Sequence, residues 1–137
     1  MFRVLVVDDD SSVRCVMAQM LGALGYDVVT ARNGLDALDL FCWEGETIHL
    51  VITDLRMPVM NGYEAVDGIR KLDRAIPIVC TSSDLSALCP PDTVFLSKPF
   101  TLAAMQDCVL RALMSARSAP LCSRIPETRP TPPRPLR

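Results

Sequence analysis

Residues 4–10 read VLVVDDD, four apolar side chains followed without a break by three carboxylates. The apolar run is typical of a buried strand, and the aspartates stand where this strand would end. Two carboxylates about 4 Å apart repel each other by roughly 4 kcal/mol at an effective dielectric constant near 20. A strand end of this kind therefore requires either a positive charge close by or open contact with water.

Short apolar runs recur along the chain and alternate with segments of helical periodicity. The strands are expected over residues 1–7, 27–31, 49–53, 76–81 and 94–97, and the helices over 11–24, 33–43, 63–73 and 102–114. Ser11 or Ser12 is expected to cap the first helix, which ends at Gly25. Asn33 is expected to cap the second. This alternation predicts an α/β fold with a doubly wound, five-stranded parallel sheet and helices on both faces.

Apolar residues within the predicted helices recur every three or four positions, which indicates one buried face for each helix. The inward faces are expected to comprise Val13, Val16, Met17, Met20, Leu21 and Leu24 in the first helix, Leu35, Leu38 and either Phe41 or Cys42 in the second, and Leu102, Met105, Cys108, Val109 and Ala112 in the last.

The segment between Ser83 and Val94 is too short for the helix that the alternation would place there. It holds ten residues, and Pro90 and Pro91 interrupt any helix after about one turn. The fourth helix of the fold is therefore expected to be shortened or absent.

Length and hydropathy indicate one domain without a membrane segment. The 137 residues suffice for a domain over residues 1–114 and a tail over residues 115–137. The longest uncharged stretch, residues 15–26, is shorter than the roughly 18 residues that a membrane helix requires, so no contact with a membrane is expected. The aspartates interrupt the first apolar run, which is not the pattern of a secretory signal. We therefore expect a cytoplasmic protein.

The six cysteines are widely spaced, and none forms a C-x-x-C motif. Cys80 lies inside an apolar run, so reduced and mostly buried thiols are expected rather than disulfides or a zinc site. His49 is the only histidine and opens an apolar run. We interpret it as a residue at the edge of a strand rather than a ligand or a catalytic base.

Charge divides the chain into two parts. Residues 115–137 hold five arginines and one glutamate, whereas residues 1–114 hold nine basic and fifteen acidic side chains, a net charge of −6. The predicted domain lacks the basic face that nucleic acid requires. The tail also holds six prolines and is expected to be disordered. Its run RPTPPRP, residues 129–135, suits either a solvated linker or a polyproline II ligand.

Charged and polar residues stand at or just after the ends of four predicted strands: Asp8, Asp9, Asp10, Asp54, Ser82 and Lys98. Ligands of doubly wound sheets bind outside the carboxyl ends of the strands, so these side chains are expected to converge. Asp8, Asp9 and Asp54 offer the oxygen ligands that Mg²⁺ prefers. If a cation and the Lys98 ammonium both face one carboxylate, that carboxylate is well placed to attack a phosphoryl group, because such catalysis consists chiefly of positioning and charge stabilisation. Asp10 precedes a helix, and we interpret it as a helix cap.

Four stretches, VLVVDDD, VITDLRMPVMNGYE, IPIVCTSS and FLSKPF, carry a family resemblance. Together they strongly resemble the receiver domain of two-component response regulators over about residues 2–114. The resemblance implies the strand order 2-1-3-4-5. Within the second stretch, Asn61 and Gly62 also favour a tight turn before the third helix.

The resemblance implies a role for each residue of the acidic cluster. Asp54 is the implied phosphoacceptor, taking a phosphoryl group from the phosphohistidine of a histidine kinase. Asp9 and Asp54 are expected to bind Mg²⁺ directly and Asp8 mostly through water. Arg56 is expected to contribute its backbone carbonyl to the same ion.

The other implied roles concern the response to phosphorylation. Ser82, rather than Thr81, is the implied switch residue, whose hydroxyl hydrogen-bonds the phosphoryl group. Lys98 is expected to form an ion pair with the same phosphoryl group. The bond between Lys98 and Pro99 is expected to be cis. Phe95 matches the aromatic residue of the family that turns inward on activation. Its position in the sequence, taken alone, is equally consistent with an ordinary aromatic residue of the core.

Arg56 and Asp84 occupy positions that flank the phosphoryl site in the family pattern. A pair between them would hinder the hydrolytic water and lengthen the lifetime of the phosphoaspartate, whereas two solvated side chains would have little effect. The short fourth helix alters a face that many receivers use to dimerise. A monomer is therefore expected before and after phosphorylation.

We interpret the chain as a stand-alone receiver, a signalling protein rather than an enzyme. It would take its phosphoryl group from a histidine kinase or a histidine phosphotransfer protein and act through a downstream protein effector. Alternatives within the class are the receiver module of a hybrid histidine kinase and a phosphorelay shuttle. A flavodoxin-like ligand-binding module would share the sheet, but no glycine-rich phosphate loop follows the first strand. A small phosphatase with an aspartate nucleophile would turn over external phosphoesters.

Overall fold

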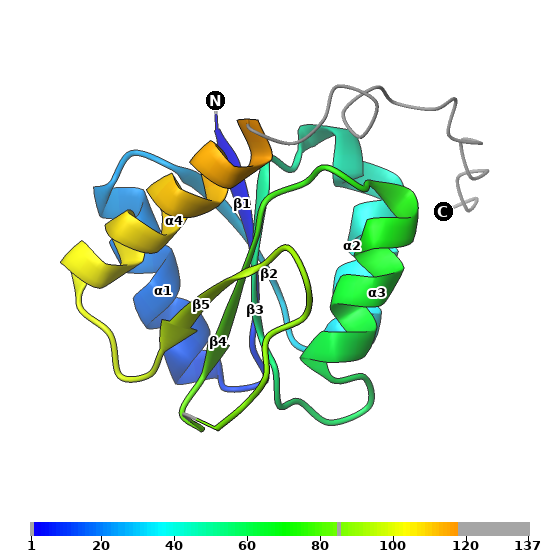
Figure 1. The fold of residues 1–137 in the computed structure, drawn as a ribbon, viewed down its shortest axis with the longest axis horizontal. Coiled ribbons are helices and arrows are strands. Elements are labelled where there is room, and N and C mark those ends of the chain that lie inside the picture. Colours follow the sequence, from blue (N-terminus) through cyan, green and yellow to red (C-terminus); the bar gives the residue numbers. More distant parts are fainter. Residues whose placement is uncertain (1, 85, 118–137) are drawn as a thin grey trace.

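The computed structural model describes residues 2–84 and 86–117, which build a parallel β-sheet with helices on either side (Figure 1). The sheet has the strand order β2-β1-β3-β4-β5, with β1 (Arg3–Val7), β2 (Asp27–Ala31), β3 (Leu50–Asp54), β4 (Ile78–Ser82) and β5 (Val94–Ser97). Every neighbouring pair of strands is parallel. The predicted fold class and strand order are confirmed.

Helices cover both faces of the sheet: α1 (Ser11–Ala23), α2 (Gly34–Glu44), α3 (Gly62–Leu72) and α4 (Leu102–Arg117), with the short 3-10 helix η1 (Gly45–Thr47) after α2. α1 and α4 pack on one face, and α2 and α3 pack on the other (Figure 1). This division follows from right-handed connections between parallel strands. Within the described residues, no helix has both the length and the apolar character needed to cross a membrane.

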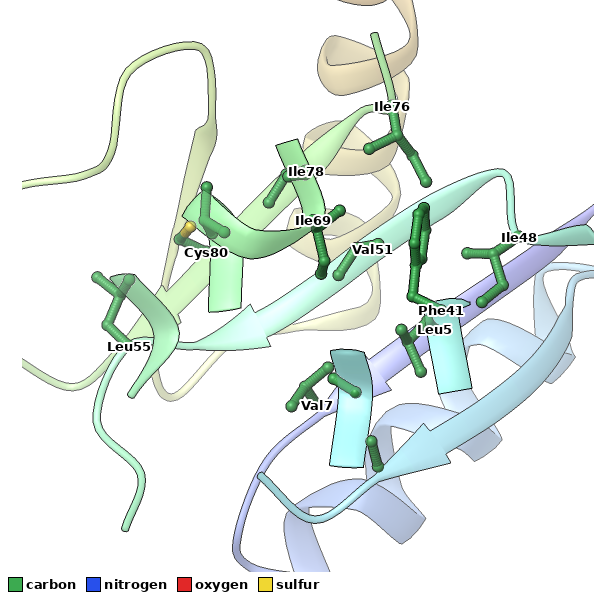
Figure 2. Packing of buried hydrophobic residues seen from close by; sticks show 13 residues of the cluster. Leu5, Val7, Phe41, Ile48, Val51, Leu55, Ile69, Ile76, Ile78 and Cys80 are labelled. Carbon is green, nitrogen blue, oxygen red and sulfur yellow. The ribbon is translucent and has the colours of Figure 1, made fainter. Parts of the chain in front are cut away.

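Two apolar clusters fill the layers between the sheet and the helices. The first lies against α2 and α3 and includes Phe41, whose side chain packs between Val51 and Ile48 (Figure 2). The second lies against α1 and α4 and includes Met17 and Met105. All five residues of β3 are buried, as its unbroken apolar sequence predicts. Truncating one large side chain in such a core costs about 2–5 kcal/mol, so the packing holds the strand ends firmly.

The connection from β4 to β5 contains no helix in its described residues, 83–84 and 86–93, so the predicted loss of the fourth helix is confirmed. Arg70 of α3 secures this connection instead. Its guanidinium donates hydrogen bonds to the carbonyl oxygens of Ile76 at 2.5 Å and Asp92 at 2.7 Å. Asp92 has a φ of 59°, in the left-handed region, where the chain turns back toward β5. One arginine thus ties the loop to the helix beside it.

Helix α1 begins at Ser11, as predicted, but its N-cap precedes the predicted cap positions. The side chain of Asp10 accepts hydrogen bonds from the backbone N–H groups of Ser12 and Val13, so Asp10, and neither Ser11 nor Ser12, is the N-cap. Aspartate and serine are equally good caps, and Asp10 has the extended backbone that is typical of an N-cap residue. The interpretation of Asp10 as a helix cap is confirmed.

Helices α3 and α4 also differ from the predicted bounds. Asn61 caps α3 through a capping box with Glu64, and Gly62 is the first helical residue rather than part of a separate turn. Helix α4 continues to Arg117, three residues beyond the predicted end at 114. The predicted disordered tail therefore begins inside this helix, and its residues 118–137 lie outside the part of the chain that the structure describes.

Several apolar residues placed on inward helix faces are exposed. The exposed fractions are 48% for Val16, 55% for Leu35 and 42% for Leu102, and Cys42 is also exposed. Each lies at the border of its apolar stripe, where a period of 3.6 residues turns the side chain away from the sheet. Phe41, rather than Cys42, fills the inward position in α2.

The described cysteines are free thiols, as predicted, but they are not mostly buried. Cys80 and Cys108 are buried and Cys89 is intermediate, whereas Cys15 and Cys42 are exposed on helices. The expectation of general burial is wrong because cysteine is small enough to occupy an exposed helix position at little cost. Cys122 lies outside the described residues.

Candidate functional site

The carboxyl ends of the central strands bring the predicted site residues together. β1 ends just before Asp8, β3 ends at Asp54 and β4 ends at Ser82. Asp54 is in register with Thr81, and the backbone N–H of Lys98 donates to the carbonyl of Ser82 at 2.9 Å. Parallel register therefore delivers side chains from four strands to one edge of the sheet.

Three carboxylates form the acidic cluster at this edge. One oxygen from each of Asp8, Asp9 and Asp54 lies within 4.8 Å of the other two. Asp8 and Asp54 are buried, with exposed fractions of 1% and 7%, and Asp9 is exposed. Carboxylate oxygens are the donors that hard divalent cations select, and Mg²⁺ commonly uses one or two of them while it keeps several waters. The donor set and the exposure of Asp9 fit such an ion.

Lys98 supplies the positive charge that the buried carboxylates need. Its Nζ donates to Oδ2 of Asp8 at 2.8 Å and to Oδ2 of Asp54 at 3.3 Å. Burial works to lower the pKa of Lys98, but the hydrogen bonds and charges of Asp8 and Asp54 outweigh it and raise the pKa above its ordinary value. The ammonium is therefore charged at neutral pH.

Asp54 is held in a partly desolvated position. Burial raises the pKa of its carboxyl above the ordinary value, and the negative charge of Asp8 adds to this effect. The backbone N–H of Arg56 and the ammonium of Lys98 act in the opposite direction without cancelling the rise. The Arg56 N–H donates to Oδ1 at 3.2 Å, and Lys98 contacts Oδ2. Each oxygen of Asp54 thus has one donor that fixes the rotation of the carboxylate.

The start of α3 packs directly against the backbone of Asp54. A Cβ atom built on Gly62 would lie 2.2 Å from the carbonyl oxygen of Asp54 and 2.6 Å from the Cα of Leu55. The N–H of Gly62 donates to the carbonyl of Leu55 at 3.1 Å. Only glycine allows this approach. Sequence reasoning missed this contact, because a tight turn and a close approach both favour glycine.

Asp8 is fixed through all of its polar atoms. Its N–H donates to the carbonyl of Ala31 at 3.2 Å, and its Oδ1 accepts from the N–H of Asp10 at 2.9 Å. Its carbonyl accepts from Nη1 of Arg14 at 2.7 Å. Sequence reasoning did not identify Arg14, because nothing in the helical pattern shows that its side chain turns back toward the strand end.

The two hydroxyls near the end of β4 have different surroundings. Oγ of Ser82 accepts from the N–H of Asp84 at 3.0 Å. Oγ1 of Thr81 is buried and has no hydrogen-bond partner among the described residues. Phe95 pairs with Cys80 in the sheet and packs, partly buried, against the first apolar cluster. The structure brings Ser82 to the site edge, while Phe95 lies one strand away on the sheet face that α2 and α3 share.

Arg56 and Asp84 are joined by an ion pair between Nη2 and Oδ2. The Arg56 side chain is 75% exposed. Hydrogen bonds from Ser86, and the charge of Arg56, hold the pKa of the Asp84 carboxyl below its ordinary value. Of the two alternatives left open by the sequence, the structure shows the pairing, which links the loop after β3 to the loop after β4. The bond between Lys98 and Pro99 is cis, as predicted.

Known proteins resemble this chain in sequence and in structure. The sensor histidine kinase RcsC of Salmonella typhi is 37% identical over 110 residues, which cover 76% of this chain and 11% of that protein. The probable transcriptional regulator ycf27 of Guillardia theta is 43% identical over 77 residues, or 56% of this chain and 29% of that protein. The chain therefore spans less than a third of the length of these two curated relatives.

A solved structure shares the fold. The receiver domain of the sensor histidine kinase PA1611 from Pseudomonas aeruginosa PAO1, which has a magnesium ion coordinated in its active-site cleft, is 27% identical with a TM-score of 0.73. The match covers 82% of this chain and 98% of that one. The family model of the response regulator receiver domain matches residues 4–110. The chain therefore belongs to the family of response regulator receiver domains.

Proposed function

We propose that this chain accepts a phosphoryl group on Asp54, in a Mg²⁺-dependent reaction, and passes the signal on through protein contacts. One observation carries the proposal: Lys98 contacts Asp8 and Asp54 together at an edge where three carboxylates lie within 4.8 Å of one another. Three strand ends, those of β1, β3 and β5, contribute to this arrangement, and a purely structural role for each residue would not require them to meet. Family membership favours this function over the flavin-binding and phosphatase alternatives.

The proposed reaction joins one oxygen of Asp54 to phosphorus. The carboxylate oxygen attacks the phosphoryl group of a phosphohistidine, the P–N bond breaks, and the imidazole nitrogen leaves with the electron pair and takes a proton from solvent. The product is an acyl phosphate on Asp54. Burial and the fixed donors from Arg56 and Lys98 orient the attacking carboxylate.

Asp9 and Asp54 would hold the ion directly, Asp8 through water, and Arg56 through its backbone carbonyl. The solved receiver domain of PA1611 contains magnesium in its active-site cleft, which supports this assignment. When bound, Mg²⁺ supplies charge neutralisation for the phosphoryl oxygens. Lys98 adds a second positive charge, and its contact with Asp54 would move to the phosphoryl group.

The proposed response begins at Ser82. Its Oγ lies at the site edge and accepts a hydrogen bond from the N–H of Asp84, and its O–H would donate to a phosphoryl oxygen. Phe95 follows as the second switch residue, because its strand pairs with β4 and its side chain is only partly buried. Movement of β4 toward the phosphoryl group would change the space available to Phe95.

The proposed setting is a stand-alone receiver, with domain bounds 1–114 and a tail over 115–137 whose first three residues belong to α4. The similarity to RcsC equally supports a receiver module of a hybrid histidine kinase. The donor is a histidine kinase or a histidine phosphotransfer protein in either case. The cytoplasm is the proposed location, since free thiols persist in reducing compartments.

The connection from β4 to β5, which holds no helix in its described residues, supports a monomer in both states. Light scattering before and after phosphorylation is expected to give one mass. A dimer that forms on phosphorylation would contradict this part of the proposal.

Intact-mass analysis tests the proposed function. The full chain is incubated with a small phosphoramidate and Mg²⁺, and a gain of one phosphoryl mass is expected. Asp54→Asn should gain none, and chelation of Mg²⁺ should abolish the gain in the unaltered chain. Asp67→Asn is the matched control, since Asp67 is an exposed partner of Lys71 on α3. Equal phosphorylation of Asp54→Asn and the unaltered chain would overturn the assignment.

A further inference from the structure

Arg14 occupies an unfavourable place for a cation. It lies four residues after the cap Asp10, in the first turns of α1, where the helix dipole disfavours positive charge. Its side chain turns back along the helix, and Nη1 donates to the carbonyl oxygen of Asp8 at 2.7 Å. Arg14 is half-buried as a residue, and its hydrogen bond to Asp8 is partly buried. Because a cation at this end of a helix is unfavourable, its presence indicates that Arg14 has a function at the neighbouring strand end.

The carbonyl that Arg14 holds belongs to the peptide unit between Asp8 and Asp9. A peptide unit is planar, so fixing its carbonyl also fixes the N–H and the Cα of Asp9. Asp8 has other restraints, because Lys98 and the N–H of Asp10 hold its carboxylate. Asp9 has none: in the described part of the chain its carboxylate makes no hydrogen bond or ion pair. Its place in the acidic cluster depends on the peptide unit alone.

We propose that Arg14 is a positioning residue for the divalent cation site, which holds the Asp8–Asp9 peptide so that the Asp9 carboxylate faces Asp54. The inference rests on the proposed function, because it assumes that Asp9 is a ligand of Mg²⁺. In this role Arg14 would touch neither the ion nor the phosphoryl group. It acts only through the peptide unit.

The charge of Arg14 and its positioning role have opposite effects on cation affinity. A positive charge close to the cluster repels Mg²⁺, so removal of the charge alone would tighten binding. Removal of the peptide restraint weakens binding, because Asp9 then samples orientations away from the ion. The sign of the change therefore separates the two roles.

Calorimetric titration of the full chain with Mg²⁺ tests the inference. Outer-shell partners of metal ligands typically contribute 10- to 100-fold in affinity, so Arg14→Met is expected to raise the Kd for Mg²⁺ by about 10-fold. Arg14→Lys keeps the positive charge and a hydrogen-bond donor. Its Kd for Mg²⁺ is expected to lie between that of the unaltered chain and that of Arg14→Met. Arg111→Met is the matched control, since Arg111 pairs with Asp107 on the outside of α4, and its Kd should match that of the unaltered chain.

Three results would overturn the inference. An Arg14→Met chain that binds Mg²⁺ as tightly as the unaltered chain, or more tightly, shows that Arg14 does not position Asp9. If Arg14→Met fails to fold by circular dichroism, an Arg14→Lys chain with unaltered Kd has the same meaning. No affinity for Mg²⁺ in the unaltered chain removes the proposed function and this inference together, whereas the first two results leave the proposed function intact.

Discussion

The ammonium of Lys98 lies closer to Asp8 than to Asp54, with Nζ 2.8 Å from Oδ2 of Asp8 and 3.3 Å from Oδ2 of Asp54. Asp8 is 1% exposed, so its charge has little contact with water. Lys98 therefore resolves much of the repulsion that three successive carboxylates create at the end of β1. The same ammonium that supports the fold stands beside the proposed phosphoacceptor.

Replacement of Lys98 by methionine should destabilise the fold by about 3 kcal/mol at neutral pH, because it leaves the buried charge of Asp8 without a partner. The folded state raises the pKa of Lys98, so the stabilisation is complete below the unfolded pKa of about 10.4 and is lost as the pH rises through the folded pKa. Urea unfolding of both chains measures the difference. It should be constant from pH 6 to about 9 and shrink above about 10.4.

Lys71→Met is the control for this substitution. Lys71 pairs with Asp67 at 3.2 Å, but both side chains are more than 70% exposed. Its loss should change the free energy of unfolding by less than about 0.5 kcal/mol. Equal effects of the two substitutions would show that Lys98 is an ordinary surface cation.

Gly62→Ala should destabilise the chain by about 1–3 kcal/mol and slow phosphorylation of Asp54. The new methyl group would meet the backbone of Asp54 and Leu55, which cannot yield as a flexible side chain does. Gly22→Ala is the matched control in α1, since nothing lies within 4 Å of its added Cβ. That change should stabilise the chain by up to about 1 kcal/mol through helix propensity. Thermal unfolding that ranks the two variants in the reverse order would contradict the close approach at Gly62.

The two hydroxyls of β4 should respond differently to removal. Thr81→Val is expected to stabilise the chain by roughly 1 kcal/mol, because a buried oxygen without a partner carries an uncompensated desolvation cost. Its phosphorylated form should still show the chemical-shift changes of activation in NMR spectra. Ser82→Ala should accept the phosphoryl group but lose those changes. A loss of the response in Thr81→Val, with Ser82→Ala unaffected, would move the switch to the other hydroxyl.

The pair between Arg56 and Asp84 should slow hydrolysis of the phosphoaspartate by hindering the attacking water. Arg56→Ala or Asp84→Ala is then expected to speed dephosphorylation by at most roughly fivefold, since exposed ion pairs are weak. The double variant should be no faster than either single one. Decay of the phosphorylated mass over time measures the rates, and unchanged rates in both single variants would dispose of this role.

The strand ends of the site could be predicted because each lies within a few residues of a short apolar run. β1, β3 and β4 are recognised by composition alone, and parallel topology then places Asp8, Asp54 and Ser82 at one edge. The loss of the fourth helix could be predicted equally well, because Pro90 and Pro91 interrupt any helix in the short segment before β5. These features depend on local sequence and on general rules of sheet connection.

The contacts that refine the site could not be predicted in the same way. Arg14 lies on a helix whose pattern says nothing of where a long side chain turns. The approach of Gly62 to Asp54 depends on how closely α3 packs on the sheet, although the N-x-x-E sequence of Asn61 and Glu64 is a recognisable capping box. Val16 and Leu35 satisfy a helical period and are nevertheless exposed, because periodicity does not define how wide the buried stripe is.

Chemical mapping of the phosphorylated residue tests the central claim most directly. The chain is phosphorylated in the presence of Mg²⁺, the acyl phosphate is reduced with borohydride to an alcohol, and the modified peptide is sequenced by mass spectrometry. We predict that the altered residue is Asp54, with none at Asp8 or Asp9. Reduction at another aspartate, or a phosphoryl group on His49 that borohydride does not reduce, would contradict the account.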